Sequence, residues 1–242
     1  MPEHEIWITK LFNEHLAGAG NAALALVGQP AQSRPWANYI TMELLVVVLM
    51  MVLFALIRTQ LSADEPGKLQ HCFELIYEFL RGQAEDFVGE NAGRYVPFFG
   101  TIFLFVLFCN LIGIIPGLES PTMFPYVTAG CAMAVFVYYN AMGVRALGVG
   151  YLKHFVGPSW ALAILMIPIE IVSNLARPLS LTVRLYANMF AGEQVTTVFL
   201  GLTKFVVPVV FMGLHVFVAL LQAYIFALLT MVYVGGAVSH EH

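Results

Sequence analysis

The chain reads ARPLSLTVRLYANMFAGE from residue 176 to residue 193, where charged residues interrupt a long apolar region. It places Arg177, Arg184 and Glu193 inside an apolar region that runs from about residue 160 to residue 200. An arginine that faces lipid costs several kcal/mol, about 2.5 to 3.5 on insertion scales. We therefore expect Arg184 to face protein, water or a counter-charge. Arg177, beside Pro178, either does the same or extends to the lipid headgroups from a helix end.

The composition around this stretch is that of a membrane protein. Of 242 residues, 60% are hydrophobic and 11% are charged, with a mean hydropathy of +0.80. Soluble domains average about 25% charged residues. The net charge of −4 predicts no nucleic-acid partner. Cys72, Cys109 and Cys131 are isolated, so we expect no disulfide framework, metal or cofactor. No cleaved signal peptide is expected either.

The hydrophobic pattern predicts an all-α polytopic membrane protein with about five membrane-embedded helices and one amphipathic interfacial helix. About 20 apolar residues are needed to cross a hydrocarbon core of ~30 Å. The expected segments, in chain order, are an external N-terminal segment (1–36), a first span (37–58), an amphipathic helix (66–90), a helical hairpin (96–144) and two long, strongly tilted helices (160–238). Within the first segment we expect a short interfacial helix and then a loop at 18–35, or else a poorly ordered terminus.

The amphipathic helix is predicted from one apolar stripe opposite a charged one, with Pro66 in its first turn. The stripe consists of Leu69, Cys72, Phe73, Ile76, Leu80, Ala84 and Phe87. Such a helix lies at the membrane interface or packs on neighbouring helices, and does not span.

The last two helices, expected at 160–199 and 205–236, are too long to stand upright. At about 1.5 Å per residue they measure ~48 to 60 Å. They must tilt, bend or break, and Pro168 and Pro178 are the expected irregularities.

Lysines and arginines predict the orientation. They gather in the connections 58–94 and 145–158, the latter with Lys153 and His154, whereas the turn after the second span has none. By the positive-inside rule these two connections are cytoplasmic and the N-terminus is outside.

The polar residues of the long helices form two groups. Glu170, Arg177 and Arg184 recur every seventh residue, which places them nearly in line on one face, together with Asn188. Glu193 follows Arg184 by nine residues, about two and a half turns, and so points to the opposite face.

The last helix carries a second polar pair. His215 and Gln222 are seven residues apart, with the small Ala219 between them on the same face. His215 is suited to relaying protons near neutral pH, or it is a buried histidine hydrogen-bonded for packing. Asn110, in the second span, is expected to make a helix–helix hydrogen bond rather than to act directly in a channel.

These residues resemble the subunit a family of the F-type ATP synthase membrane sector. The resemblance covers about residues 37–238 in order, and the pattern at 184–193 is highly specific. The matching motifs are RLYANMFAGE at 184–193, His215 with LQAYIF at 221–226, PFFGT at 97–101 and NLIGIIPG at 110–117.

The resemblance implies a non-catalytic stator subunit for proton transport and ATP synthesis, set in a bacterial cytoplasmic (inner) membrane or an organelle membrane. Its implied partners are a ring of c subunits, peripheral-stalk b subunits, a soluble ATPase head and lipid. Arg184 would meet each ring carboxylate, with Asn188 beside it. Glu193, His215 and Gln222 would line the outer half-channel. Glu170 would lie on the side of the cytoplasmic half-channel, and Arg177 would occupy a position that is usually basic in the family.

One departure from the family is visible. Tyr126-Val127-Thr128 stands where members often have Asn-Val-Thr, so the Tyr126 hydroxyl is a candidate substitute. Glu119 is a candidate for the outer entrance. Two other classes stay open. A secondary transporter would show internal symmetry, which is not seen here. A haem-binding membrane anchor would need paired intramembrane histidines, and only His215 lies deep in an apolar span.

Overall fold

The computed structural model describes residues 5–26, 28–59, 61–62, 67–89, 92–115, 117–148, 150, 160–202 and 206–238. These residues form helices, turns and irregular segments and no strand, which confirms the all-α prediction. The α-helices are α1 (Trp7–His15), α2 (Ala17–Leu26), α3 (Asn38–Thr59), α4 (Lys68–Val88), α5 (Val96–Ile112), α6 (Pro125–Leu147), α8 (Trp160–Leu202) and α9 (Val206–Val238). Two short 3-10 helices are η1 (Ala92–Arg94) and η2 (Pro121–Met123).

The N-terminal segment contains two helices, so the loop expected at 18–35 is wrong over its first part. Residues 17–26 are rich in alanine and leucine, strong helix formers that outweigh the two glycines among them. At Gly20 the absent side chain leaves room for Pro35 and Trp36, because a Cβ would lie 2.7 Å from Pro35 Cγ. The Trp36 indole donates to the Leu16 carbonyl at 2.8 Å, which fastens the returning chain to the helices.

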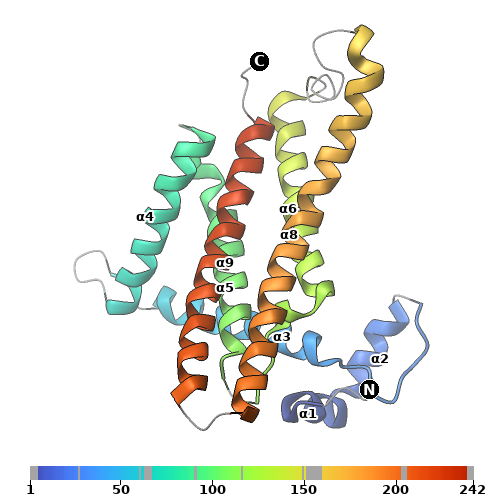
Figure 1. Ribbon diagram of the computed structural model, residues 1–242, viewed down its shortest axis with the longest axis vertical. Helices are drawn as coiled ribbons and strands as arrows, with labels where there is room; N and C mark the ends of the chain where they lie inside the picture. The colour runs from blue at the N-terminus through green and yellow to red at the C-terminus, as the bar shows by residue number, and fades with distance from the viewer. Residues whose placement is uncertain are drawn as a thin grey trace.

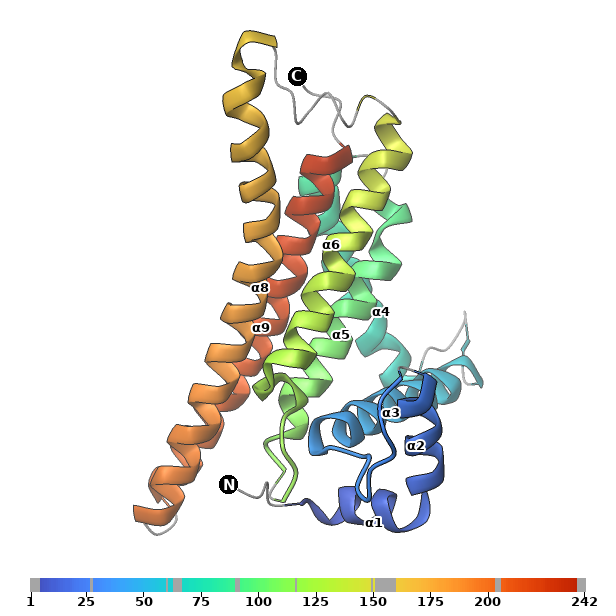
Figure 2. The same cartoon turned by 90° about the vertical axis from the view of Figure 1, so that its right-hand side faces the viewer.

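The first predicted span is α3, and it lies across the long axis of the bundle that α5, α6, α8 and α9 form (Figures 1 and 2). Its buried residues Val46 and Met50 pack on α5, whereas Met42, one turn earlier, packs on Ile6 and Ile8 of the N-terminal segment. Many of its other side chains are apolar and exposed, as expected for a helix in contact with lipid.

The amphipathic helix is α4, which packs on α5 and α9. Only the middle of the predicted stripe is covered: Leu80 and Ala84 are fully buried. Leu69, Cys72 and Phe87 are exposed, so the neighbouring helices leave both ends of the stripe uncovered. Pro66 and residues 63–65 lie outside the described residues.

The hairpin is formed by α5 and α6, and the long pair by α8 and α9. The helix α8 has 43 residues and continues through Pro168 and Pro178, so these prolines do not break it. Figure 2 shows it curved along its length. At about 1.5 Å per residue it measures ~65 Å, twice the hydrocarbon thickness.

The ends of the helices sort into two groups (Figure 1). The end of α4, the start of α5, the end of α6, the start of α8 and the end of α9 lie together. The end of α5, the start of α6, the end of α8, the start of α9 and the N-terminal helices lie at the opposite end. Lys153 and His154 of the predicted cytoplasmic loop lie outside the described residues.

By length and composition, helices in the described ranges that could cross a membrane are Asn38–Thr59, Pro125–Leu147 and Val209–Val238. The apolar α5 is shorter, with 17 residues. The four charged residues of α8 set it apart from these three, and they mark where function is to be sought.

Candidate functional site

The two sides of α8 have different surroundings. Leu181, Leu185 and Met189 form its buried ridge, which packs in the core of the bundle. Arg184 is exposed on one side of this ridge, and Glu193 is half-buried on the other. At about 100° per residue the two side chains diverge by roughly half a turn. Arg184 and Glu193 therefore serve different environments.

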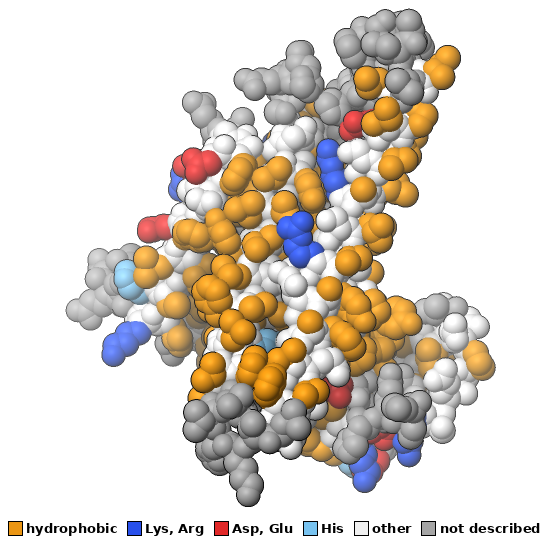
Figure 3. Space-filling model, in the orientation of Figure 1, with side chains coloured by type: hydrophobic (Ala, Val, Ile, Leu, Met, Phe, Trp, Pro, Cys, Tyr) orange, Lys and Arg blue, Asp and Glu red, His pale blue; other side chains and the backbone are white. Residues whose placement is uncertain are grey.

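Arg184 stands on an apolar outer face. Leu179 and Val183 beside it are 65% and 53% exposed, as is expected of a surface meant for lipid or another membrane helix. Figure 3 shows basic side chains on α8 among hydrophobic ones. In the part of the chain that the structure describes, no acidic side chain forms a salt bridge with Arg184. An arginine on an apolar helix face without such a partner is a candidate functional residue.

Asn188 and Gln222 connect the Arg184 side of α8 to α9. The Asn188 side-chain nitrogen donates to the Gln222 side-chain oxygen at 2.8 Å. Asn188 is exposed one turn after Arg184, whereas Gln222 is buried. This hydrogen bond joins the exposed side of α8, where Arg184 lies, to the buried interface between α8 and α9.

Glu193 and His215 line one cavity on the other side. This cavity, of about 320 Å³, lies between α8, α9 and the turn that follows α5. A single water needs only about 15 Å³ of such space. The lining residues are Glu193, Thr196 and Thr197 of α8, Met212 and His215 of α9, and Gly113, Ile114, Ile115, Gly117 and Leu118. The structure thus brings an acid and a histidine from two helices to a space that can hold several waters.

The ring of His215 is buried and lacks a partner on one nitrogen. Its side chain is 6% exposed, and among the described atoms none forms a hydrogen bond with Nε2. A buried polar atom without a partner is costly, so a water in the adjoining cavity is its natural partner. Gly192 of α8 faces this ring, and a Cβ at that residue would lie 3.5 Å from it, an ordinary contact.

Asn110 connects the cavity-forming turn to α9. Its side-chain nitrogen donates to the Ala219 carbonyl at 3.2 Å, which confirms the predicted helix–helix hydrogen bond. Thr122 donates to the Asn110 side-chain oxygen at 2.6 Å, and Ser120 donates to the Cys109 carbonyl at 2.8 Å. Sequence reasoning missed Ser120 and Thr122, because hydroxyls in a turn carry no periodic signal.

Glu119 and Tyr126 lie near the same turn but differ in their contacts. Glu119 accepts a hydrogen bond from the Asn38 side chain at 3.2 Å, and it is next to Leu118, which lines the cavity. Tyr126 is 72% exposed and its ring packs on Tyr39 with centroids 5.8 Å apart. Tyr126 is not among the residues that line the cavity.

Glu170 and Arg177 lie toward the other end of α8, and both are half-buried. Arg177 contacts aromatic side chains of α6 and α9: its Cζ is 5.8 Å from the ring centroid of Tyr139 and 5.4 Å from that of Tyr233. The predicted site residues are therefore spread along α8 and α9, with Arg184 between an acid toward each end.

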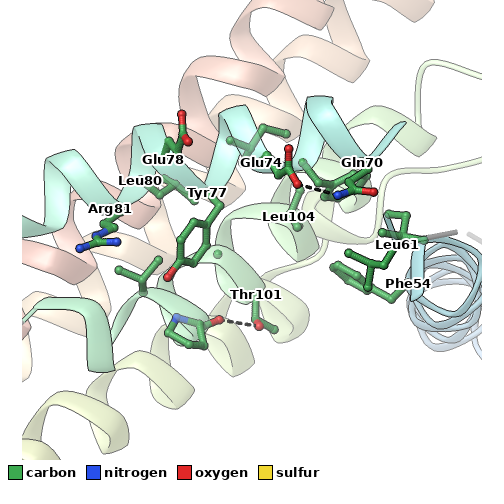
Figure 4. A pocket seen from close by; sticks show the side chains of 16 residues that line it. Phe54, Leu61, Gln70, Glu74, Tyr77, Glu78, Leu80, Arg81, Thr101 and Leu104 are labelled. Carbon is green, nitrogen blue, oxygen red and sulfur yellow. Dashed lines mark hydrogen bonds between the residues drawn. The ribbon is translucent and has the colours of Figure 1, made fainter. Parts of the chain in front are cut away.

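A larger hollow of about 460 Å³ lies elsewhere, between α3, α4 and α5 (Figure 4). Its polar side chains make local contacts: Gln70 donates to Glu74 at 2.8 Å and Thr101 to the Pro97 carbonyl at 2.7 Å. None of the predicted site residues lines it. This hollow is larger than the cavity lined by Glu193 and His215, but the charged residues predicted to be functional lie on α8 and α9.

Comparison with known proteins identifies the family to which the sequence is similar. The profile of the ATP synthase A chain family matches residues 40–235. The chain is 65% identical over 233 residues to ATP synthase subunit a of Solibacter usitatus, covering 96% of this chain and 100% of that one. It is 46% identical over 242 residues to ATP synthase subunit a of Koribacter versatilis, covering 99% of each.

Proposed function

This chain belongs to the ATP synthase subunit a family, and from that premise we propose that it is the stator subunit of a proton-translocating F-type ATP synthase. It forms two aqueous half-channels against a rotating ring of c subunits. The observation that carries the proposal is Arg184: it is an exposed arginine on an apolar helix face, without an acidic partner in the described part of the chain.

Arg184 supplies a fixed positive charge for the ring. A ring carboxylate must be neutral to pass through lipid and charged to exchange its proton. A cation within about 4–6 Å favours the charged form. Arginine stays protonated under all working conditions, which lysine does not guarantee. Arg184 also separates the two half-channels, so protons cross only by riding on the ring.

The outer half-channel is the cavity of Glu193 and His215. Its polar lining, its volume and the unpartnered His215 nitrogen favour a water-filled path. The Asn188–Gln222 hydrogen bond leads from this side of the helix pair toward the Arg184 face. A proton entering at Glu193 is handed toward the ring near Arg184.

The inner half-channel runs along the first half of α8, where Glu170 and Arg177 are half-buried on the Arg184 side. We assign the end of the bundle that holds Arg94, Arg145 and the start of α8 to the cytoplasm, which leaves the N-terminus outside. If α3 crosses the bilayer upright, the bundle across it is strongly inclined, which accommodates the length of α8 (Figure 2).

The subunit itself performs no covalent chemistry in this proposal. Its partners are the c ring, the b subunits of the peripheral stalk and, through the stalks, the soluble ATPase head. The membrane is the bacterial cytoplasmic membrane, since the relatives are bacterial. The membrane potential supplies about 2.3 kcal/mol per charge per 100 mV, to which any pH gradient adds.

Arg184→Ala tests this function in inverted membranes that contain the whole complex. We expect ATP-driven proton pumping to be abolished while the c ring and the ATPase head still co-purify with the subunit. The control is Arg145→Ala, an exposed arginine near the end of α6, which should leave pumping close to normal. Near-normal pumping by Arg184→Ala membranes would overturn the proposal.

A further inference from the structure

A polar and aromatic cluster lies where α6, α8 and α9 meet, toward the proposed cytoplasmic end. The Arg177 guanidinium carbon is 5.8 Å from the Tyr139 ring centroid and 5.4 Å from that of Tyr233. The two rings are themselves 5.8 Å apart and inclined by 52°. A guanidinium within about 6 Å of an aromatic ring is attracted to its electron-rich face. Two neighbouring helices thus hold the Arg177 side chain.

The Tyr139 ring is fixed in turn by α8. It is 1% exposed, and its hydroxyl donates to the side-chain oxygen of Asn174 and, at 3.4 Å, to the Asn174 backbone carbonyl. Asn174 is 7% exposed and donates to the Asn140 side chain at 3.4 Å. These contacts link α6 to α8 three residues before Arg177, so the ring cannot turn away without leaving buried polar groups unpaired.

These contacts bear on the two predictions for Arg177, namely that it faces protein or that it extends to the lipid headgroups. A free arginine near a helix end extends its charged group toward the headgroups. Here the side chain lies against two rings and is half-buried. It is also on the Arg184 face of α8, seven residues before Arg184, which is about 10.5 Å along the helix.

We propose that Tyr139 and Tyr233 form an aromatic clamp that positions the Arg177 guanidinium beside the inner half-channel, with Asn174 holding the Tyr139 ring. The inference rests on the proposed function. A cation held there favours the charged form of a ring carboxylate that reaches the inner half-channel. The clamp thereby promotes release of the proton on the cytoplasmic side during ATP synthesis. Both tyrosines are positioning residues, because they act through Arg177.

The test compares ATP synthesis by energised membranes, the direction in which the ring releases protons to the cytoplasm, normalised to the amount of assembled complex. Tyr139→Leu removes a ring and should lower the rate on the order of threefold or more, as should Arg177→Leu. The Tyr139→Leu/Arg177→Leu double variant should be no slower than Arg177→Leu alone, since the tyrosine acts only through the arginine. Tyr139→Trp keeps an aromatic face and should retain more activity than Tyr139→Leu. Tyr138→Leu is the control, because its ring stacks on Phe98 instead.

Independent effects of Tyr139→Leu and Arg177→Leu, which multiply in the double variant, would reduce Tyr139 to a packing residue and overturn the clamp. A normal rate of ATP synthesis in Tyr139→Leu membranes would do the same. If Tyr139→Leu prevents assembly, Tyr233→Leu carries the same comparison. Arg184→Ala distinguishes a failure of the clamp from a failure of the proposed function. If it abolishes pumping while the clamp variants are normal, only the clamp is wrong; if it pumps, the proposed function itself is wrong.

Discussion

Asn188 on α8 donates a hydrogen bond to Gln222 on α9, with 2.8 Å between nitrogen and oxygen. The two ends of this bond differ in environment, because Asn188 is exposed and Gln222 is 3% exposed. The bond therefore links the face of α8 that carries Arg184 to the buried interface between the two long helices.

Asn188→Leu should destabilise the complex by about 1–3 kcal/mol, because it leaves the buried amide of Gln222 without its partner. Replacing both residues, in Asn188→Leu/Gln222→Leu, should recover part of this loss, since no polar group is then stranded. The measurement is the temperature at which the purified complex dissociates, which does not depend on proton flux. A double variant that shows the simple sum of the two single losses would contradict this account.

Arg184→Lys should lose most coupled activity although the nominal charge is kept. A lysine in a poorly hydrated site can release its proton, and it cannot offer two parallel hydrogen bonds to a carboxylate. ATP synthesis by energised membranes measures the effect, with Arg145→Lys as control. Retention of most of the activity would mean that charge alone matters at this position.

Glu193 and His215 should behave as one unit, because they line the same cavity from two helices. We expect Glu193→Gln and His215→Ala each to slow proton flux, and the double variant to be less impaired than two independent losses predict. Flux through membranes stripped of the ATPase head measures this. Strictly independent losses would argue against a shared outer path.

Gly192 should tolerate alanine but not valine. An alanine Cβ would lie 3.5 Å from the His215 ring, an ordinary contact. The extra methyl groups of Gly192→Val would press on the ring and cost about 1–3 kcal/mol. Gly201→Val, on the same helix with nothing within 4 Å of its Cβ position, is the matched control. Proton flux that falls equally in both valine variants would show that helix propensity, not contact with His215, is responsible.

Cysteines at positions 170 and 193 should differ in the side from which they react. In a background without Cys72, Cys109 and Cys131, Glu170→Cys should react faster with a membrane-impermeant thiol reagent from the cytoplasm, and Glu193→Cys faster from outside. The physical reason is that the two acids lie toward opposite ends of α8 relative to Arg184. The reverse pattern would exchange the two half-channels.

Local periodicity was enough to predict part of this site. The nine-residue spacing of Arg184 and Glu193 predicted opposite sides of one helix, and the seven-residue spacing of His215 and Gln222 predicted a shared face; both side chains of the latter pair are buried in α9. Helical geometry is a property of the chain itself, so neighbours in sequence suffice for such predictions.

Contacts between distant segments were not predictable in this way. The bond from Thr122 to Asn110 joins a turn to a helix, and that from Tyr139 to Asn174 joins residues 35 positions apart. Their existence depends on how helices cross, which the periodicity of one helix does not specify. For the same reason, the sequence of α4 predicted its apolar stripe but not how much of that stripe the neighbouring helices bury.

The unbroken course of α8 has a mechanical consequence. Glu170 and Glu193 are both carried on this one helix, which passes Pro168 and Pro178 without interruption. At about 1.5 Å per residue their separation is ~35 Å. In the proposed function, a hinge between them would let the two half-channels move apart under the torque of the ring. Under that proposal, one continuous helix would hold the proton entrance and exit at a fixed separation while the ring turns.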